Sequence, residues 1–295
     1  MYYNMKASRD KWAMMKKEAQ RMAARLFSLA QPRMFGEEEQ SFEARARRMD
    51  SCARQISWRG CDECNIRYIT RASFCRDRLC PLCAWRRARR LAMKTLSAMR
   101  AVEGEGTLFF VTFTTPNVSW EALRDHLNEL SRRWGRVVSG LGRRLHGHIR
   151  AIEISRGRDG MAHAHIHAVL HMGAWGLSSG ELATLWGGNV DLRWIRSSVA
   201  VHDRLAAYMT KGTQQGVMFS DEELEAFARA IQGRRLWTAA GTLRLGDDAD
   251  TSAALGAGAE TMRLIPGEGA RCPLCGGVLR RGLDCWNGIH YHERR

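Results

Sequence analysis

The residues that follow Gly106 alternate between strand-like and helix-like patterns. The run LFFVTFTT, which begins after Thr107, is β-branched and aromatic and predicts a strand, and Pro116 with Asn117 closes it as a turn. Between residues 119 and 138, large apolar side chains recur at helical spacing, and Ser119 is the expected N-cap. These apolar positions are Leu123, Leu127, Leu130, Trp134 and Val137. The pattern therefore predicts a strand followed by an amphipathic helix.

Two further strand-like runs, HIRAIEIS and MAHAHIHAVLHM, lie between residues 148 and 172. The link between them contains Asp159-Gly160, a dipeptide favoured in tight turns, so we expect a hairpin. NVDLRWI, at 189–195, predicts another short strand, and DRLAAYMTKG, at 203–212, predicts a helix. This order of elements indicates an α+β fold class, with an antiparallel sheet and helices on one face.

Composition divides the chain into five predicted segments. They are a basic helical segment at 1–50 with a turn at Gln31-Pro32, a Cys-rich zinc module and Arg-rich helix at 51–103, a central domain at 104–238, a linker rich in Ala, Gly and Asp at 239–270, and a small zinc-ribbon-like segment at 271–295. The helix in the second segment is expected from about residue 84 to residue 100.

The charge balance favours a polyanionic partner. Lys and Arg number 46 against 31 Asp and Glu, which gives a net charge of +15. Charge alone leaves open a basic protein that merely stays in solution. There is no apolar stretch of membrane-spanning length and no secretory signal pattern, so we expect a cytoplasmic protein that does not enter membranes. In a reducing compartment the nine cysteines are better metal ligands than disulfide partners.

Three histidines at every second position give the strongest chemical signal. Side chains of a strand alternate between its two faces, so His163, His165 and His167 project from one side of the sheet. Glu153 on the preceding strand joins them if the hairpin register places it on the same face, and is otherwise a surface carboxylate. Imidazoles with a carboxylate suit a divalent ion such as Mn²⁺ or Mg²⁺.

The cysteines fall into two clusters. Cys61-x-x-Cys64 and Cys80-x-x-Cys83, fifteen residues apart, have the spacing of a structural four-thiolate zinc site formed by two facing knuckles. Cys75 is an alternate ligand, and it or Cys52 could replace Cys61. A second zinc site is predicted near the C-terminus, with an ambiguous fourth ligand. Its candidate ligands are Cys272, Cys275, Cys285 and either His290 or His292.

Tyr208 is the one tyrosine inside the predicted central domain. On a helix, Lys211 and Arg204 share its face. Taken alone, a helical tyrosine beside cations is an ordinary packing and solvent arrangement. Nearby positive charge would, however, favour the phenolate and neutralise an attacked phosphate. Tyr208 is therefore a candidate nucleophile whose case depends on the neighbouring motifs.

The order of these motifs resembles that of plasmid rolling-circle replication initiators, members of the HUH endonuclease superfamily. VTFTTPN, AHAHIHAVL and YMTK look like three successive motifs of that family, and FCRDRLCPLCAWRRARR is similar to a Cys- and Arg-rich segment in one of its branches. The resemblance covers roughly residues 60–215 and assigns residues 104–238 to an HUH endonuclease domain.

The resemblance implies a nicking and joining activity on single-stranded or hairpin origin DNA. His165 and His167 would bind the metal, with Glu153 or His163 completing the site. Tyr208 would form a 5′-phosphotyrosyl link, and Lys211 would position the scissile phosphate. Related initiators often carry a Glu where this chain has Arg204, which leaves open what activates the terminating attack.

Further partners and rival functions follow from the same comparison. A host helicase or polymerase is an expected partner of such an initiator. DNA contacts are expected from the arginines of the Cys-rich module and the late helix, Arg86, Arg87, Arg89, Arg90 and Arg204. The alternatives are an HUH-class transposase and a non-catalytic zinc protein that only binds nucleic acid.

Overall fold

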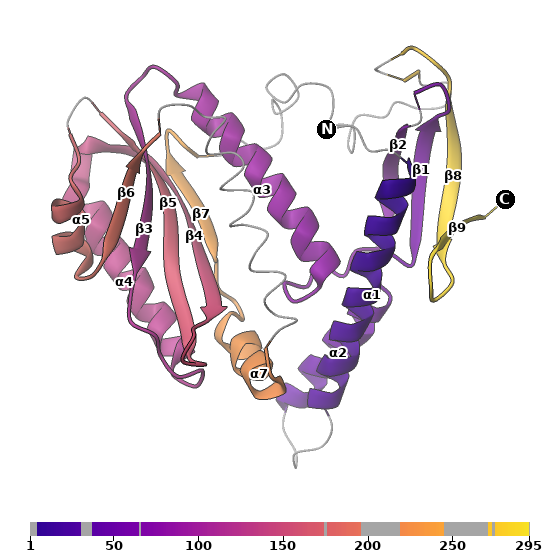
Figure 1. The fold of residues 1–295 in the computed structure, drawn as a ribbon, viewed down its shortest axis with the longest axis horizontal. Coiled ribbons are helices and arrows are strands. Elements are labelled where there is room, and N and C mark those ends of the chain that lie inside the picture. The colour runs from indigo at the N-terminus through magenta and orange to yellow at the C-terminus, as the bar shows by residue number, and fades with distance from the viewer. Residues whose placement is uncertain are drawn as a thin grey trace. The chain divides into compact units, whose positions relative to one another are not determined.

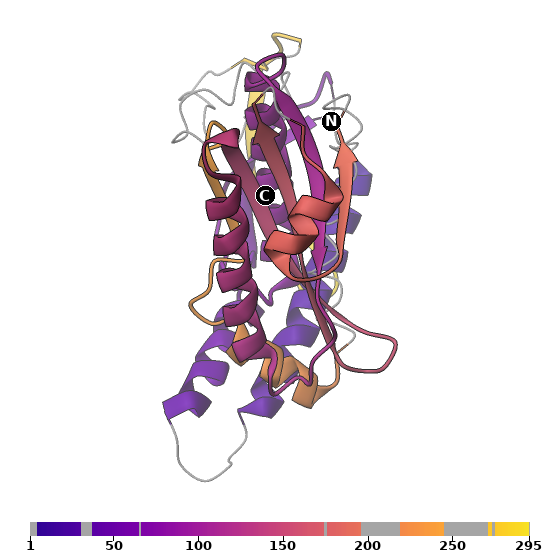
Figure 2. The same cartoon turned by 90° about the vertical axis from the view of Figure 1, so that its left-hand side faces the viewer.

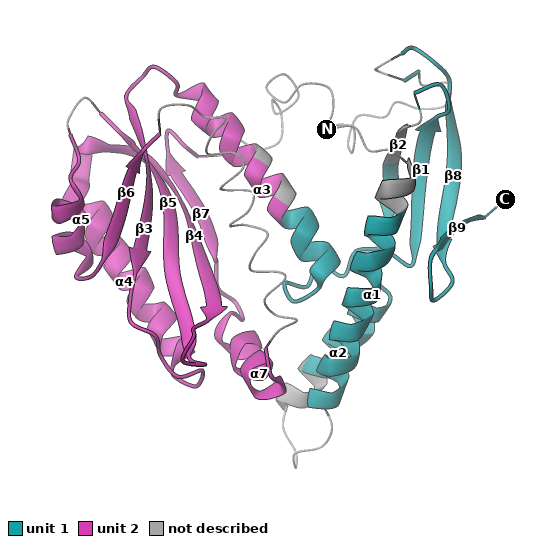
Figure 3. Ribbon diagram, viewed as in Figure 1, with its two compact units in different colours: residues 1–87, 248–295 teal, residues 88–247 magenta. Residues whose placement is uncertain are grey.

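The computed structural model describes residues 5–30, 37–64, 66–173, 176–195, 219–244, 271–272 and 275–294. The chain forms two compact units (Figure 3). One contains residues 1–87 and 248–295, and the other contains residues 88–247. The α+β class expected from the sequence is confirmed. None of the helices in the described ranges combines the length and apolar composition needed to cross a membrane.

The unit of residues 88–247 is built on a five-stranded sheet in which all neighbouring strands are antiparallel. The order across the sheet is β6-β3-β5-β4-β7 (Figure 1). The strands are β3 Thr107–Thr114, β4 Leu145–Arg156, β5 Ala162–Met172, β6 Val190–Trp194 and β7 Trp237–Gly241. The predicted hairpin is present as β4 and β5, and Gly160 in its loop has a positive φ of 78°. The histidine strand therefore lies at the centre of the sheet.

Helices α4 (Leu123–Leu141) and α5 (Ser179–Trp186) cover one face of this sheet (Figure 2). The apolar stripe expected from the sequence is buried on α4, where Trp134 packs edge-on against Phe113 of β3. The expected N-cap is wrong: α4 begins at Leu123, and its N-cap, Ala122, has no side-chain cap. A short 3-10 turn, η1 (Gly142–Arg144), follows α4, and α7 (Asp221–Ala230) begins with a capping box from Ser220 and Glu223.

The other face of the sheet packs against the C-terminal end of α3 (Pro81–Ala101). Helix, sheet and a following segment share one buried cluster. Its members are Ala98, Met99, Val102, Phe110, Ile149, Val169 and Leu243. Phe110 and Val169 lie on the same face as His165 and His167, because alternate residues of β3 and β5 share a face. One half of the histidine face is therefore apolar core, and the triplet of histidines lies beyond it.

The unit of residues 1–87 and 248–295 contains two packed helices, α1 (Met5–Leu29) and α2 (Glu37–Asp50). It also contains a four-stranded antiparallel sheet in the order β2-β1-β8-β9. These strands are β1 Gln55–Cys61, β2 Ile66–Ala72, β8 Leu279–Trp286 and β9 Tyr291–Arg294. Two strands from the C-terminal segment thus pair with two from the Cys-rich segment.

One face of this four-stranded sheet is buried. Trp58 is 2% exposed and Tyr291 6%. The Trp286 indole donates to Gln20 of α1, and the Tyr291 hydroxyl donates to the Ala53 carbonyl. The segment at 271–295 was expected to form a small module of its own, whereas here it completes a sheet that begins at residue 55. The predicted linker from 239 likewise starts inside β7.

Candidate metal centres

Strand pairing brings three metal-binding side chains together on the central hairpin. Glu153 of β4 lies directly opposite His165 of β5, so both side chains point to the same face. His167, two residues further along β5, shares that face. This is the register in which the sequence analysis expected Glu153 to join the histidines. His165 and His167 come from adjacent positions of one face, and Glu153 completes the triad from the neighbouring strand.

The three donor atoms of this triad converge on one point. His167 Nε2 lies 2.9 Å from Glu153 Oε2 and 2.9 Å from His165 Nε2, and His165 Nε2 lies 3.3 Å from the same carboxylate oxygen. Ligands about 2.1 Å from an ion, at right angles to one another, lie about 3 Å apart. The spacing therefore fits three adjacent positions around one divalent ion. A facial arrangement of this kind leaves the remaining positions open.

The electrostatics of the triad favour an ionised carboxylate. Burial alone would raise the pKa of Glu153, but hydrogen bonds and positive charge from His165 and His167 outweigh it and lower that pKa to about 2. Glu153 is 8% exposed. A buried anion beside two imidazole nitrogens is the donor set that binds a divalent cation.

Neighbouring side chains fix how the imidazoles present their nitrogens. Thr112 Oγ1 lies 3.2 Å from His167 Nδ1, and Phe110 stacks on the His167 ring with centroids 5.7 Å apart. A proton on Nδ1 would be donated to Thr112, leaving the Nε2 lone pair directed toward Glu153 and His165. Thr112 was not identified from the sequence, although its place in VTFTTPN, opposite the histidine strand, could have indicated it.

His163 does not join the triad. Its Nδ1 lies 2.6 Å from the Asn117 side-chain oxygen, and Asn117 in turn donates to Asp159 in the β4–β5 loop. Burial and the neighbouring charge of His165 lower the pKa of His163. Of the two residues that could complete the site, Glu153 is therefore the one that the fold places beside His165 and His167, while His163 fastens the turn after β3 to the hairpin loop.

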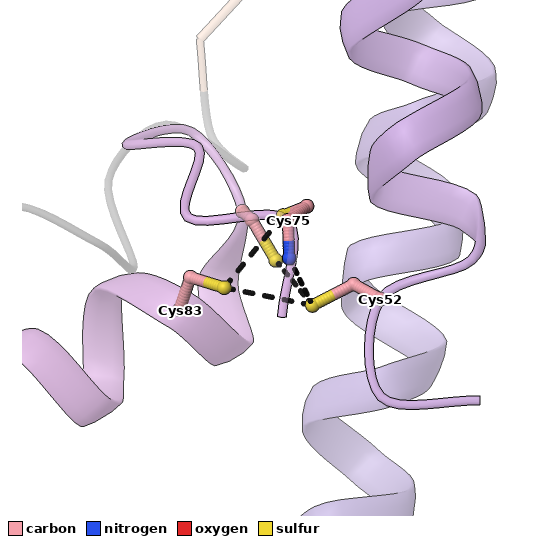
Figure 4. A group of neighbouring side chains, drawn as sticks. Cys52, Cys75 and Cys83 are labelled. Carbon is pink, nitrogen blue, oxygen red and sulfur yellow. Dashed lines mark hydrogen bonds between the residues drawn. The ribbon is translucent and has the colours of Figure 1, made fainter. Parts of the chain in front are cut away.

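Four cysteines form a first thiolate cluster, namely Cys52, Cys75, Cys80 and Cys83. Cys52 Sγ lies 3.5 Å from Cys83 Sγ and 3.8 Å from Cys80 Sγ (Figure 4). Tetrahedral zinc with Zn–S bonds near 2.3 Å places its sulfurs about 3.8 Å apart. Hydrogen bonds from neighbouring thiols lower the pKa of Cys83, which favours the thiolate that zinc binds. The geometry thus fits one tetrahedral ion.

A second cluster joins distant parts of the chain, Cys61, Cys64, Cys272 and Cys275. Cys61 and Cys275 sulfurs lie 3.3 Å apart, as do those of Cys64 and Cys272. After Cys272 the chain turns sharply, because Gly276 donates to the Cys272 carbonyl and adopts a φ of 75°. Two knuckles face each other here, one after β1 and one before β8, which is the architecture of a zinc ribbon.

The ligand sets predicted from the sequence are therefore wrong. Cys61 and Cys64 do not share a site with Cys80 and Cys83, and Cys75 and Cys52 are both members of the first cluster. Cys285 lies within β8 opposite His292, while His290 contacts Asn287 in the β8–β9 turn. Neither they nor His292 belongs to a cluster of described residues. Strand pairing, not spacing along the chain, selects the partners.

The arginines predicted to contact DNA have different surroundings. Arg86 stacks over the Phe74 ring at 3.4 Å, and Arg87 donates to the Arg76 carbonyl, so both hold the first cysteine cluster's loop. Arg90 is exposed on α3. Four predicted site residues lie outside the described residues or have side chains that do: Arg89, Arg204, Tyr208 and Lys211.

Comparison with known proteins agrees with these features. Residues 66–175 match a family model described as "Replication protein". This segment is a replication protein domain. It contains β3, the β4–β5 hairpin and the whole triad, and it confirms the resemblance to replication initiators that the motifs indicated.

The relatives of the replication protein domain are bacterial. A "Protein rep" of Lentilactobacillus hilgardii is 31% identical over 135 residues, 43% of this chain and 41% of that protein. Proteins of the same name from Bacillus amyloliquefaciens and a Bacillus species are 28% and 26% identical, over 48% and 49% of this chain. The matches span half or less of each relative, at 41%, 45% and 50%. No solved structure matches the chain.

Proposed function

We propose that this chain is a rolling-circle replication initiator that nicks single-stranded origin DNA and rejoins the strands. The observation that carries the proposal is the convergence of Glu153, His165 and His167 on the central strands of a replication protein domain. Sequence order supports it further, because Tyr208 and Lys211 follow the histidine strand as they do in the family that the motifs resemble.

The proposed chemistry is a phosphoryl transfer to tyrosine. The Tyr208 phenol oxygen attacks a phosphodiester phosphorus and loses its proton, while the bond to the 3′ oxygen breaks and that oxygen leaves as a 3′-hydroxyl after protonation. A second 3′-hydroxyl reverses the reaction and rejoins the strand. A divalent ion, Mg²⁺ or Mn²⁺, would polarise and orient the scissile phosphate. Glu153, His165 and His167 would hold it, and Lys211 would neutralise a phosphate oxygen.

We further propose that both cysteine clusters bind zinc and have structural roles. Each offers four sulfurs at tetrahedral spacing without a nearby open position among the described residues, and closed four-thiolate sites are typical of structural zinc. Lys16, buried at 0% exposure, donates to the Asp50 carbonyl two residues before Cys52. A buried ammonium at this position would offset part of the negative charge of four thiolates.

An adduct assay tests the nicking proposal. The protein is incubated with Mn²⁺ and a 40-nucleotide single-stranded DNA pool of randomised sequence that carries fluorescein at its 3′ end. A 5′-phosphotyrosyl link retains the 3′ fragment, so a fluorescent band should migrate with the protein on a denaturing gel. The same pool labelled at the 5′ end should give free labelled fragments and no such band.

Matched variants identify the groups involved. Tyr208→Phe should abolish the adduct, whereas Tyr2→Phe, which removes a phenol far away in sequence, should leave it intact. His167→Ala should also abolish it, because it removes a donor from the triad. An adduct of normal yield from Tyr208→Phe would contradict the assigned nucleophile, and no adduct from the wild-type protein would contradict nicking itself.

A further inference from the structure

The four-stranded sheet has one exposed face that is rich in arginine. Strand pairing places Arg59 of β1 directly opposite Arg281 of β8. Ser57, two residues before Arg59 on the same face, pairs with Arg71 on one side and with Leu283 on the other, and Leu283 pairs with Arg294. We call this surface the arginine face, comprising Arg59, Arg71, Arg281 and Arg294. Its positive charge spans all four strands.

The carboxylates of these strands lie on the opposite, buried face. Asp284 pairs with Ile56 and with Glu293, so both acids share the side of the sheet that holds Trp58 and Trp286. Arg280, on that side, forms ion pairs of 2.8 Å with Asp62 and 2.9 Å with Glu293. Positive and negative charge are thus segregated between the two faces, and the strands contribute no acid to the arginine face.

The arginine face is accessible. Arg71, Arg281 and Arg294 are exposed, and Arg59 is half-buried. Neighbouring strands lie about 4.8 Å apart, so the guanidinium groups from β2 to β9 spread over roughly 14 Å. Guanidinium forks match phosphate oxygens in shape and charge. A flat surface of this kind can contact successive phosphates of a polyanion.

We propose that the arginine face binds the phosphate backbone of duplex DNA. It has the charge to do so, and none of the side chains described on it is aromatic, whereas binding to single strands relies on bases stacked on aromatic rings. The proposal deepens the function proposed above and rests on it. The zinc-ribbon unit holds double-stranded DNA through sequence-independent contacts, and the replication protein domain acts on the unpaired strand.

Salt dependence of duplex binding tests the arginine face. The full-length zinc-loaded protein is titrated against a fluorescein-labelled 30-base-pair duplex of random sequence at several salt concentrations, without added Mg²⁺ or Mn²⁺. Each phosphate contact contributes about 0.9 to the slope of log affinity against log salt. The variant R71Q/R281Q/R294Q should therefore lose about 2.7 from that slope, and on the order of 10²-fold in affinity at 0.1 M salt.

A control with the same change in charge separates a specific surface from net charge. Arg21, Arg47 and Arg132 are exposed, and each pairs with a glutamate on its own helix, Glu18, Glu43 and Glu129. R21Q/R47Q/R132Q should keep a slope within one unit of the wild-type value. The single variants Arg71→Gln and Arg294→Gln, each expected to lose about 0.9, give the same answer should the triple variant fold poorly.

The outcomes are distinct from those of the nicking test. R71Q/R281Q/R294Q should still form the adduct with the single-stranded pool, since the triad is unchanged. Equal losses in the variant and the control, an unchanged slope, or a loss confined to single-stranded DNA would each overturn the proposal. An inactive wild-type protein would refute nicking, while the slope measurement would still decide whether the arginine face binds duplex DNA.

Discussion

Replacing Cys272 with serine should remove one zinc ion and loosen the ribbon unit. Cys272 and Cys64 are separated by 208 residues, and the cluster that joins them closes this loop in the unfolded chain. By the loop-entropy relation used for covalent cross-links, closing a loop of that length is worth about 5 kcal/mol at 25 °C, an upper bound for a metal link. The free energy of unfolding of this unit should therefore fall by several kcal/mol in Cys272→Ser.

Zinc content is the decisive measurement. Protein purified without chelator is unfolded in the presence of a colorimetric zinc indicator, and zinc is counted per chain. We expect two equivalents in the wild-type protein and one in Cys272→Ser. The double variant C61S/C272S should also retain one, because both residues belong to the same cluster. Urea unfolding followed by tryptophan fluorescence gives the accompanying loss of stability, since Trp58 and Trp286 are buried in this unit.

Cys285→Ser is the matched control for this experiment. Cys285 lies in β8 only ten residues from Cys275 but belongs to neither cluster, so the variant should keep two zinc equivalents. Loss of zinc from Cys285→Ser would restore the C-terminal ligand set that spacing suggested. A C61S/C272S protein without zinc would show that the two residues serve different sites, and the ribbon described here would be wrong.

Three further predictions concern the replication protein domain and the ribbon sheet. Thr112→Val removes the hydroxyl beside His167 Nδ1 and should weaken Mn²⁺ binding about 10- to 100-fold, seen as a higher Mn²⁺ requirement for adduct formation, while Thr107→Val should not. The pKa of Glu153 is lowered to about 2, so its contribution to stability is present above its unfolded value near 4.5 and is lost as pH falls toward 2. In protein without added Mg²⁺ or Mn²⁺, the difference in unfolding free energy between wild type and Glu153→Gln should thus reach about 3 kcal/mol near neutral pH and shrink below pH 4, and a constant difference would contradict this reasoning. Gly282→Ala should destabilise the ribbon unit by about 1 to 3 kcal/mol in urea unfolding, because a Cβ there would overlap the Trp58 indole, whereas Gly288→Ala, open to solvent, tests only its positive φ of 102°.

The sequence was sufficient for the central site because its signals are local. Histidines at every second residue determine a common face whatever the rest of the fold, and Asp159-Gly160 predicts the tight hairpin that brings Glu153 opposite His165. The same alternation could not decide between Glu153 and His163, because that choice depends on Asn117, which lies on a different part of the chain and binds His163. Tyr208 and Lys211 lie outside the described residues, so their place in the site stays a prediction.

The cysteine partners could not be predicted in the same way. All Cys-x-x-Cys pairs look alike in sequence, and the entropic cost of closing a loop rises by only about 0.6 kcal/mol per doubling of its length, so nearness along the chain is a weak guide. The choice is made by β1 and β8, whose seven paired positions run from Gln55–Cys285 to Cys61–Leu279 and so bring the end of β1 beside the start of β8. Without a prediction of that strand pairing, the pairing of knuckles remains undetermined.

The chain order of the two units gives the second cluster its role. The replication protein domain lies in residues 88–247, a continuous segment whose sheet pairs strands close in sequence, whereas the ribbon unit is assembled from residues 1–87 and 248–295. A unit made from two distant segments pays the cost of bringing them together, and a metal cluster with two ligands on each segment offsets that cost. The continuous unit has no such need. Zinc loss should therefore act on the ribbon unit and its arginine face, and the triad of Glu153, His165 and His167 should persist without it.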